Sequence, residues 1–136
     1  MSNSYLIIGG SSDIAIQTIH KLLVDGNHVT ILARDMSRVS QLAEQGVTVI
    51  EGDALDEDAL SSAIQAATDS GAGKISGVAH LVGSIVIRPP HALKVDAFEE
   101  VIRTNLTSAF LTLSLTGKAM IKSGGGRMVF TSSVAG

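Results

Sequence analysis

A short turn rich in small residues is the first candidate for chemistry in this sequence. Gly9 and Gly10 directly follow the apolar run 5–8, and a segment with helical periodicity begins at about Asp13. Glycine lets a ligand approach the backbone closely, and the unpaired N–H groups at a helix start bind phosphate. An ordinary strand-to-helix turn would show the same residue types. The residues that the phosphate hypothesis involves are Gly9, Ser11, Ser12, Asp13 and Ile14.

Asp13 is a position where a carboxylate has two opposing effects. It suits the positive end of a helix and can cap it, but a negative charge beside a diphosphate is unfavourable. We therefore expect the Asp13 carboxylate to turn back and accept hydrogen bonds from backbone N–H groups of the helix start.

Two charged residues follow later apolar runs. Arg34 comes after the run 28–33, where a nucleotide-binding unit of this kind usually has a carboxylate for the ribose 2′-hydroxyl. A cation there favours a 2′-phosphate, and so NADP(H) over NAD(H), although a solvated surface arginine is the simpler alternative. Asp53, beside Ala54, follows the run 47–50 and could accept a hydrogen bond from an adenine amino group. A loop aspartate near a helix start explains Asp53 equally well.

Three further polar positions lie in or beside apolar segments. Asn105 lies near the middle of the apolar stripe of a long helix predicted at 96–121, so its amide must be hydrogen-bonded, as a structural or a functional group. Ser132 and Ser133 follow the last apolar run, where a hydroxyl could hold a substrate carbonyl or simply belong to a polar loop. His80 lies within the fourth run, and a buried, hydrogen-bonded histidine is the simplest interpretation. The stripe consists of Phe98, Val101, Ile102, Ala109, Thr112 and Leu113.

An alternation of apolar runs and helical segments must position these candidates. Nearly continuous apolar runs are typical of parallel strands that are buried on both faces, and a ligand then binds beyond their carboxyl ends. We predict one α/β domain over residues 1–136, a doubly wound parallel sheet in three layers with about five strands. Strands are predicted at 5–8, 28–33, 47–50, 75–82 and 127–131, and helices at 13–25, 37–44, 56–67 and 96–121, with a loop at 83–95. Asp56 is expected to cap the helix at 56–67.

Composition narrows the classes of function. The 136 residues are 45% hydrophobic and 17% charged, which suits a packed domain and excludes global disorder. A net charge of −3 without a basic stretch argues against a nucleic-acid partner, and the absence of cysteine excludes disulfides and thiolate chemistry. No signal peptide or membrane-spanning run is recognised, and no histidine spacing suggests a metal site. A cytoplasmic location is the resulting expectation.

Together the motifs resemble those of the short-chain dehydrogenase/reductase family, over nearly the whole chain. Residues 8–15 (IGGSSDIA) resemble its T-G-x-x-x-G-I-G turn, with Asp13 and Ala15 in the places of two glycines. Residues 52–54 (GDA) resemble its D-V element near the adenine. Residues 80–83 (HLVG) stand where N-N-A-G occurs, so that only the final glycine is shared.

Two more segments resemble the part of the family pattern that carries catalysis. Residues 103–107 (RTNLT) match the helical segment with the catalytic asparagine, and residues 126–136 (GRMVFTSSVAG) resemble G-R-I-V-x-x-S-S-x-x-G. The resemblance implies that Ser133 donates a hydrogen bond to the substrate carbonyl and that Asn105 supports a water-mediated proton relay. It also implies that Gly83 belongs to the cofactor site.

The resemblance implies a Rossmann-like fold, incomplete after the fifth strand, and an NAD(P)(H)-dependent oxidoreductase. Such an enzyme transfers hydride between the nicotinamide and a carbonyl or secondary alcohol, with NADP(H) favoured and NAD(H) possible. The family's tyrosine and lysine belong beyond Ser133, but the sequence ends at Gly136 and its only tyrosine is Tyr5. We expect an N-terminal part of such an enzyme that is inactive alone, or a short relative that lost the chemistry. A non-catalytic dinucleotide-binding or regulatory module and a scaffold protein are the alternatives.

The resemblance also bears on partners. It implies a small-molecule carbonyl or alcohol substrate, no nucleic acid or membrane, and a homo-oligomer at full length, with the long helix in the subunit contact. A full-length relative would add further elements beside the fifth strand. An uncovered edge strand and helix stripe favour aggregation, so we expect the isolated chain to be poorly soluble or partly molten.

Overall fold

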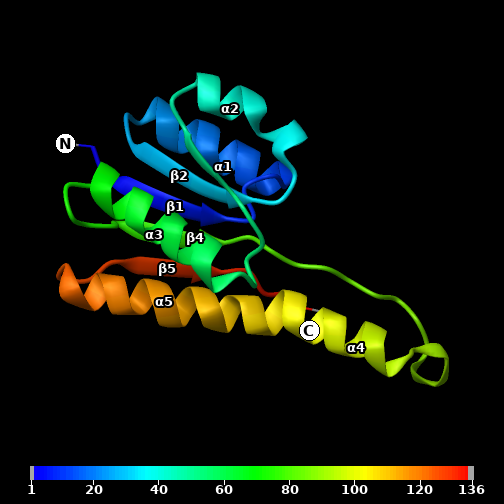
Figure 1. The fold of residues 1–136 in the computed structure, drawn as a ribbon. Helices are drawn as coiled ribbons and strands as arrows, with labels where there is room; N and C mark the ends of the chain where they lie inside the picture. The colour runs from blue at the N-terminus through cyan, green and yellow to red at the C-terminus, as the bar shows by residue number, and fades with distance from the viewer. Residues whose placement is uncertain (1, 135–136) are drawn as a thin grey trace.

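A parallel five-stranded sheet forms the centre of the protein, whose computed structural model describes residues 2–134. The strand order is β3-β2-β1-β4-β5, so the chain builds one side of the sheet from β1 outward and then returns to build the other (Figure 1). The reversal falls between β1 and β4, and a ligand binds at such a switch point in open α/β sheets. The predicted parallel sheet is confirmed. The strands are β1 (Ser4–Ile8), β2 (His28–Ala33), β3 (Thr48–Glu51), β4 (Gly77–His80) and β5 (Arg127–Phe130).

Helices cover the two faces of this sheet, and alternate residues of β1 supply both layers. Ile7 packs on one face in a cluster with residues of α1 (Asp13–Val24) and α2 (Ser40–Glu44). Leu6 and Ile8 point to the other face, where α3 (Glu57–Ser70) and α5 (Ser108–Lys122) pack (Figure 1). The alternation follows from the period of two along a strand, and it explains why both faces require apolar residues.

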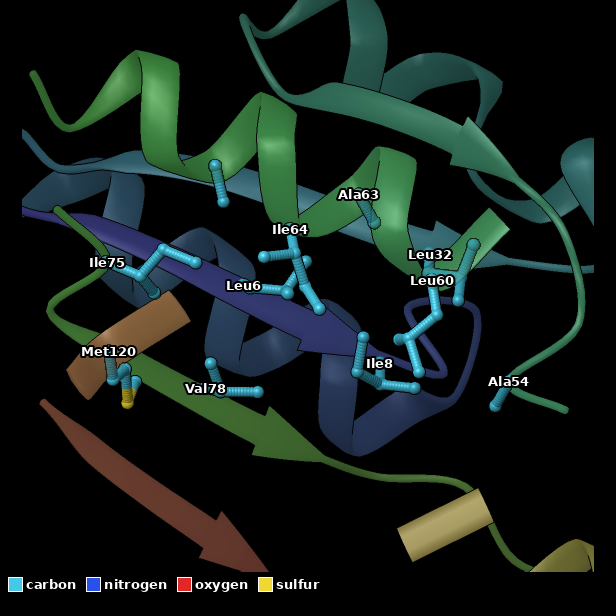
Figure 2. Close-up of a cluster of buried hydrophobic side chains, with 11 residues drawn as sticks. Leu6, Ile8, Leu32, Ala54, Leu60, Ala63, Ile64, Ile75, Val78 and Met120 are labelled. Atoms are coloured by element: carbon cyan, nitrogen blue, oxygen red, sulfur yellow. The ribbon is translucent and has the colours of Figure 1, made fainter. Parts of the chain in front are cut away.

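The cluster on the α3 side supports the carboxyl ends of the central strands. Figure 2 shows Leu60 and Ala63 of α3 directed toward Leu6 and Leu32 of the sheet. Asp56 caps α3 as predicted, because its Oδ1 accepts hydrogen bonds from the N–H groups of the second and third residues of the helix. A firm cap and a buried face hold α3 close to the ends of β1 and β2.

The strand predicted at 75–82 and the helix predicted at 37–44 both differ from the structure. The fourth strand ends at His80 instead of residue 82, because its partner β1 ends at Ile8, which pairs with His80 and leaves nothing beyond for the ladder. The helix predicted at 37–44 is a 3₁₀ turn, η1 (Met36–Arg38), followed by α2. Val39 separates the two with φ −118° and ψ −2°, while its side chain is fully buried.

The long helix predicted at 96–121 exists, but of its predicted buried stripe Thr112 is buried whereas Phe98, Ile102 and Leu113 are exposed. It consists of α4 (Val95–Ile102), a π-helical turn η3 (Arg103–Thr107) and α5, and a 3₁₀ turn η2 (Pro90–Ala92) precedes it. Phe98 and Leu113 of the predicted stripe are 54% and 51% exposed. The residues of α5 that are buried are Ser108, Thr112, Thr116 and Met120. A π-helical turn inserts a residue and so rotates the faces before and after it relative to each other.

Candidate functional site

A cavity of about 680 Å³ opens at the carboxyl ends of the strands, next to the switch point. This volume is typical of a pocket for a small molecule or cofactor. The structure brings together here seven residues from different segments that the sequence singled out: Gly9, Ser11, Ser12, Arg34, Asp53, Ala54 and Gly83. Four other predicted site residues do not line it: Asp13, Ile14, Asn105 and Ser133.

The turn between β1 and α1 forms one wall of this cavity. Gly9 has φ +87°, a conformation that favours glycine, and a Cβ there would lie 2.8 Å from Val82 Cγ2 and 2.9 Å from the Leu81 carbonyl oxygen. The N–H groups of Gly9 and Gly10 donate to the Leu32 carbonyl oxygen at 2.9 and 3.1 Å. The turn is therefore fixed between the ends of β2 and β4, and only glycine fits at its first position.

The start of α1 is capped by Ser12, and the expectation for Asp13 is wrong. Ser12 has an extended backbone (φ −73°, ψ 157°), and its Oγ accepts a hydrogen bond from Ala15 N at 3.1 Å. Asp13 already belongs to the helix, and its Oδ1 accepts from Arg38 Nη2 at 2.6 Å. Among residues 2–134, the N–H groups of Asp13 and Ile14 have no acceptor, so they remain available to an anion.

The two charged residues predicted for different parts of a nucleotide lie side by side. Arg34 Nη1 lies 3.6 Å from Asp53 Oδ2, with side chains that are 74% and 45% exposed. Asp53 Oδ1 also accepts a hydrogen bond from Leu55 N at 2.9 Å, which fixes the carboxylate at the end of β3. An exposed ion pair of this kind contributes little stability, so Arg34 can turn to an anionic ligand at small cost.

Asp35, directly after Arg34, is engaged by its own loop. Its Oδ1 accepts from both the N–H and the hydroxyl of Ser37, at 3.1 and 2.5 Å. These hydrogen bonds, led by that of the Ser37 hydroxyl, lower the pKa of the Asp35 carboxyl from its ordinary value. One oxygen of the carboxylate next to Arg34 thus accepts from the turn, while the residue also lines the cavity.

Asn105 is half-buried, and all its polar atoms are paired. Its Oδ1 accepts from Ser84 N at 3.1 Å, while its Nδ2 donates to the carbonyl oxygens of Ser84 and Val101, both at 2.9 Å. The amide joins the chain after β4 to the π-helical turn η3. The predicted need for hydrogen bonds is confirmed, although the apolar stripe around Asn105 faces outward.

His80 anchors the same turn from the sheet. Its ring is 3% exposed, and Nε2 lies 2.9 Å from Ser108 Oγ. The Ser108 hydroxyl donates to the Thr104 carbonyl oxygen at 2.5 Å, so Nε2 must carry a hydrogen and donate to Ser108. Burial lowers the pKa of the His80 imidazole from its ordinary value of 6.5. The interpretation of His80 as a buried, hydrogen-bonded histidine is confirmed.

One predicted site residue, Ser133, does not line the cavity, whereas charged residues that no motif indicated do. Ser133 lies in an exposed, irregular segment after β5 and away from the cavity lining, and residues 135–136 of its motif lie outside the described residues. Arg38 and Glu100 line the cavity although no motif pointed to them. Their charge was the only signal in the sequence, and charge alone does not separate a cavity residue from a surface one.

Comparisons with known proteins establish the family. The family model for short chain dehydrogenase matches residues 3–136, and the chain belongs to this family. It is 29% identical over 136 residues to the 3-oxoacyl-[acyl-carrier-protein] reductase MabA of Mycobacterium tuberculosis, covering 100% of this chain and 53% of that protein. It is also 29% identical over 147 residues to dehydrogenase/reductase SDR family member 4 of Rattus norvegicus, covering 100% of this chain and 51% of the relative.

The fold comparison agrees with the family. A short-chain type dehydrogenase/reductase from Mycobacterium ulcerans superimposes with a TM-score of 0.87 at 26% identity, over 99% of this chain and 54% of that one. The predicted Rossmann-like fold is confirmed. The chain spans about half the length of the curated relatives that it matches.

Residues 2–134 contain neither a membrane-spanning helix nor a cluster of metal-ligating side chains. In residues 2–134 no helix has the length and apolar character needed to span a bilayer. Within the same part of the chain, no group of three or more His, Cys, Asp or Glu side chains could hold a metal ion. The chemistry that the cavity offers is therefore that of backbone amides, hydroxyls and a few charged side chains.

Proposed function

We propose that this chain binds a nicotinamide dinucleotide in the cavity at the carboxyl ends of the strands. The observation that carries the proposal is the turn after β1, which needs glycine at Gly9 and leaves the N–H groups of Asp13 and Ile14 open beside the cavity. A dinucleotide fits such a site, because its diphosphate takes hydrogen bonds from amides at a positive helix end. Bound there, the cofactor supplies the hydride for a redox reaction.

The lining residues divide into parts that suit the parts of a dinucleotide. Ser11 and Ser12 lie at the turn and suit the diphosphate, while Asp53 and Ala54 lie after β3 and suit the adenine. Gly83 lies on the nicotinamide side, where a Cβ would meet Asn105 Oδ1 at 3.0 Å. The glycine keeps this wall open and leaves the Asn105 amide in place.

NADP(H) is the preferred cofactor in this proposal, with NAD(H) as the weaker one. Arg34 extends from the end of β2 into the cavity wall, and its exposed pair with Asp53 is easily exchanged for a 2′-phosphate. Oδ1 of the Asp35 carboxylate accepts from Ser37, and its Oδ2 is the acceptor that a ribose 2′-hydroxyl of NAD(H) would use.

Titration with both cofactors tests this proposal. The fluorescence of reduced nicotinamide is followed as the full chain is added to NADPH or to NADH. We expect saturable binding of both, with NADPH bound more tightly, and Arg34→Gln removes about tenfold of the NADPH affinity and little of the NADH affinity. Arg127→Gln, at the start of β5, is the matched control. Absence of saturable binding by the wild-type chain contradicts the proposal.

The reaction of the whole protein is proposed to be hydride transfer between the nicotinamide and a carbonyl or secondary alcohol. Asn105 supports a proton relay and Ser133 binds the substrate carbonyl in this proposal, which rests on family membership. A bound nicotinamide would supply or accept the hydride, and the relay that Asn105 supports would carry the proton to or from the substrate oxygen. We expect no turnover by the 136-residue chain, because its only tyrosine, Tyr5, is in β1.

A non-catalytic dinucleotide-binding module is the second candidate, since the tyrosine present in these 136 residues, Tyr5, lies in β1 and does not line the cavity. The two candidates differ in one assay, in which NADPH oxidation is followed by absorbance with a panel of ketones and aldehydes. The chain is tested alone and with its natural downstream sequence attached. Turnover by the longer protein supports the oxidoreductase, and binding without turnover in both supports the module.

Self-association is the proposed role of the outer face of α4 and α5. The exposed apolar residues on this face are Phe98, Ile102, Leu106, Phe110 and Leu113. Their spacing of three or four residues makes a continuous stripe along the helix. Apolar stripes of this length are more typical of an interface than of free surface, so a homo-oligomer is expected.

A further inference from the structure

An acidic side chain occupies the helix end that the proposed function assigns to a diphosphate. Asp13 is the first residue of α1, and its own N–H group is one of the two that remain open. A carboxylate at this point stabilises the helix through its dipole when no ligand is bound. It also repels a phosphate that binds to the same amides. The turn therefore needs a way to keep this charge from the ligand.

Arg38 makes the contact that meets this need. Its Nη2 lies 2.6 Å from Asp13 Oδ1, and it joins two segments that are 25 residues apart in the chain. Arg38 ends η1 and lines the cavity, whereas Asp13 does not line it and its side chain is 89% exposed. The ion pair thus holds the carboxylate outside the cavity and balances its charge.

The other charges near this pair have their own main partners, although the Arg38 charge also helps to lower the pKa of the Asp35 carboxyl. Arg34 pairs with Asp53, and the Asp35 carboxylate accepts from Ser37. Within residues 2–134 the Asp13–Arg38 contact is the ion pair that reaches the start of α1. If Arg38 is removed, no other cation in this part of the chain is paired with the carboxylate.

We propose that the Asp13–Arg38 ion pair permits dinucleotide binding at this turn, and that Arg38 is a positioning residue that acts through Asp13. The inference rests on the proposed cofactor site and adds to it a residue that no motif indicated. It has two consequences. Loss of Arg38 weakens NADPH and NADH equally, because both carry the same diphosphate, and the loss disappears once position 13 is uncharged.

A double-mutant cycle on the full chain tests this coupling. Dissociation constants for NADPH and NADH are measured for wild type, Arg38→Gln, Asp13→Asn and the double variant, with Arg38→Lys as the charge-conserving variant. We expect Arg38→Gln to weaken both cofactors about fivefold, since an exposed unpaired charge acts at high effective dielectric. Arg38→Lys retains most of the affinity. The double variant binds within about twofold of Asp13→Asn alone.

Melting temperatures without cofactor provide a readout separate from binding. An exposed ion pair contributes little stability, so each variant is expected to melt close to wild type, as does the control Arg127→Gln. If Arg38→Gln melts much lower, the comparison of the double variant with Asp13→Asn still decides the coupling, because both lack the Asp13 charge.

Each alternative result has a distinct meaning. A loss confined to NADPH, or one that persists in the Asp13→Asn background, means that Arg38 contacts the cofactor directly and overturns the inference alone. No effect of Arg38→Gln overturns it as well. Failure of the wild-type chain to bind either cofactor overturns both the inference and the proposed function.

Discussion

The two sides of the sheet differ in how completely they are covered. In the central strands β1, β2 and β4, residues such as Leu6, Ile31 and Val78 are buried between helices. At the β5 edge, Val129 is 61% exposed, and Phe110 on the neighbouring helix is 62% exposed. The turn that is predicted to bind a diphosphate therefore follows a buried central strand, whereas Asn105 and Ser133 lie near the more exposed edge of the sheet.

A second cavity lies on the α1 face of the sheet and extends to its exposed β5 edge. It has a volume of about 670 Å³, and Tyr5, Gly77 and Val129 form part of its wall. Apolar residues on a strand therefore indicate that a face is to be covered, but they do not indicate by what.

The largest expected difference between the two sides is the cost of losing a core leucine. Leu6→Ala should lower the free energy of unfolding by about 4 kcal/mol, because it leaves a cavity in the packed layer of Figure 2. Leu113→Ala, at a position that is 51% exposed, should cost less than about 0.5 kcal/mol. Urea denaturation at a concentration where the chain is monomeric measures both. Equal costs would mean that α5 is covered in the monomer.

A somewhat smaller effect is expected at the glycine turn. Gly9→Ala should cost about 3 kcal/mol, since φ +87° is strained for alanine and the Cβ would press on Val82 and the Leu81 backbone. The matched control is Gly124→Ala, which has a similar φ of +92° but open space around the Cβ, and should cost about 1 kcal/mol. Similar melting temperatures for the two variants would show that the turn is not tightly held.

Sequence reasoning succeeded where local rules and burial agree. The run 5–8 and the glycines after it predicted β1 and its turn, and Asp56 predicted the cap of α3. It did not identify Ser12 as the cap of α1, because serine and aspartate stand side by side and both are good caps. Nor could it find Arg38, whose partner Asp13 is distant in the chain and adjacent only in the fold.

The long helix is where periodicity misled. The predicted stripe included Thr112, which is buried, but also Phe98 and Leu113, which are exposed. Within residues 2–134 the hydroxyls of Thr112 and Thr116 on the buried face have no hydrogen-bond partner. These small side chains let α5 approach the sheet, with Met120 as the large apolar residue buried there. The π-helical turn at Asn105, which local propensity does not encode, shifts the two halves of the helix relative to each other.

The histidine between the two sides predicts a smaller, pH-dependent effect. Because burial lowers the pKa of His80 below 6.5, the unfolded chain takes up a proton first as pH falls. Stability is therefore present above that value and is lost as pH falls below it. His80→Asn should remove this part of the loss and cost about 1 kcal/mol at neutral pH through the contact with Ser108.

The control for this titration is His20→Asn, since His20 is exposed on α1. Chemical denaturation at several pH values measures the free energy of unfolding for each variant. The His20 variant should retain the pH dependence of wild type. A His80→Asn curve that still follows the wild-type curve in this range would show that the buried imidazole is not responsible.

The smallest effect on stability is expected at the outer stripe. Leu106→Glu should change the free energy of unfolding by less than about 0.5 kcal/mol, because the side chain is 63% exposed, yet it should abolish self-association by adding a charge to the stripe. Sedimentation velocity measures the association, and Ile14→Glu, 68% exposed on another helix, is the control. Unchanged association of the Leu106 variant would remove the proposed role of this face.

Poor solubility or partial molten character of the isolated chain also stays a prediction. It follows from the exposed apolar residues on β5 and on the helix beside it. Binding of a hydrophobic dye by the chain at neutral pH would support it. A sharp, cooperative thermal transition of a monomeric sample would contradict it.

Hydrogen–deuterium exchange with and without NADPH tests the central claim most directly. The claim is that a diphosphate binds to the open N–H groups at the start of α1. It predicts slower exchange of the amides in residues 9–14 when NADPH is bound, with little change in residues 115–122 of α5. No protection at residues 9–14 under saturating NADPH, or protection that appears only along α5, would contradict the account.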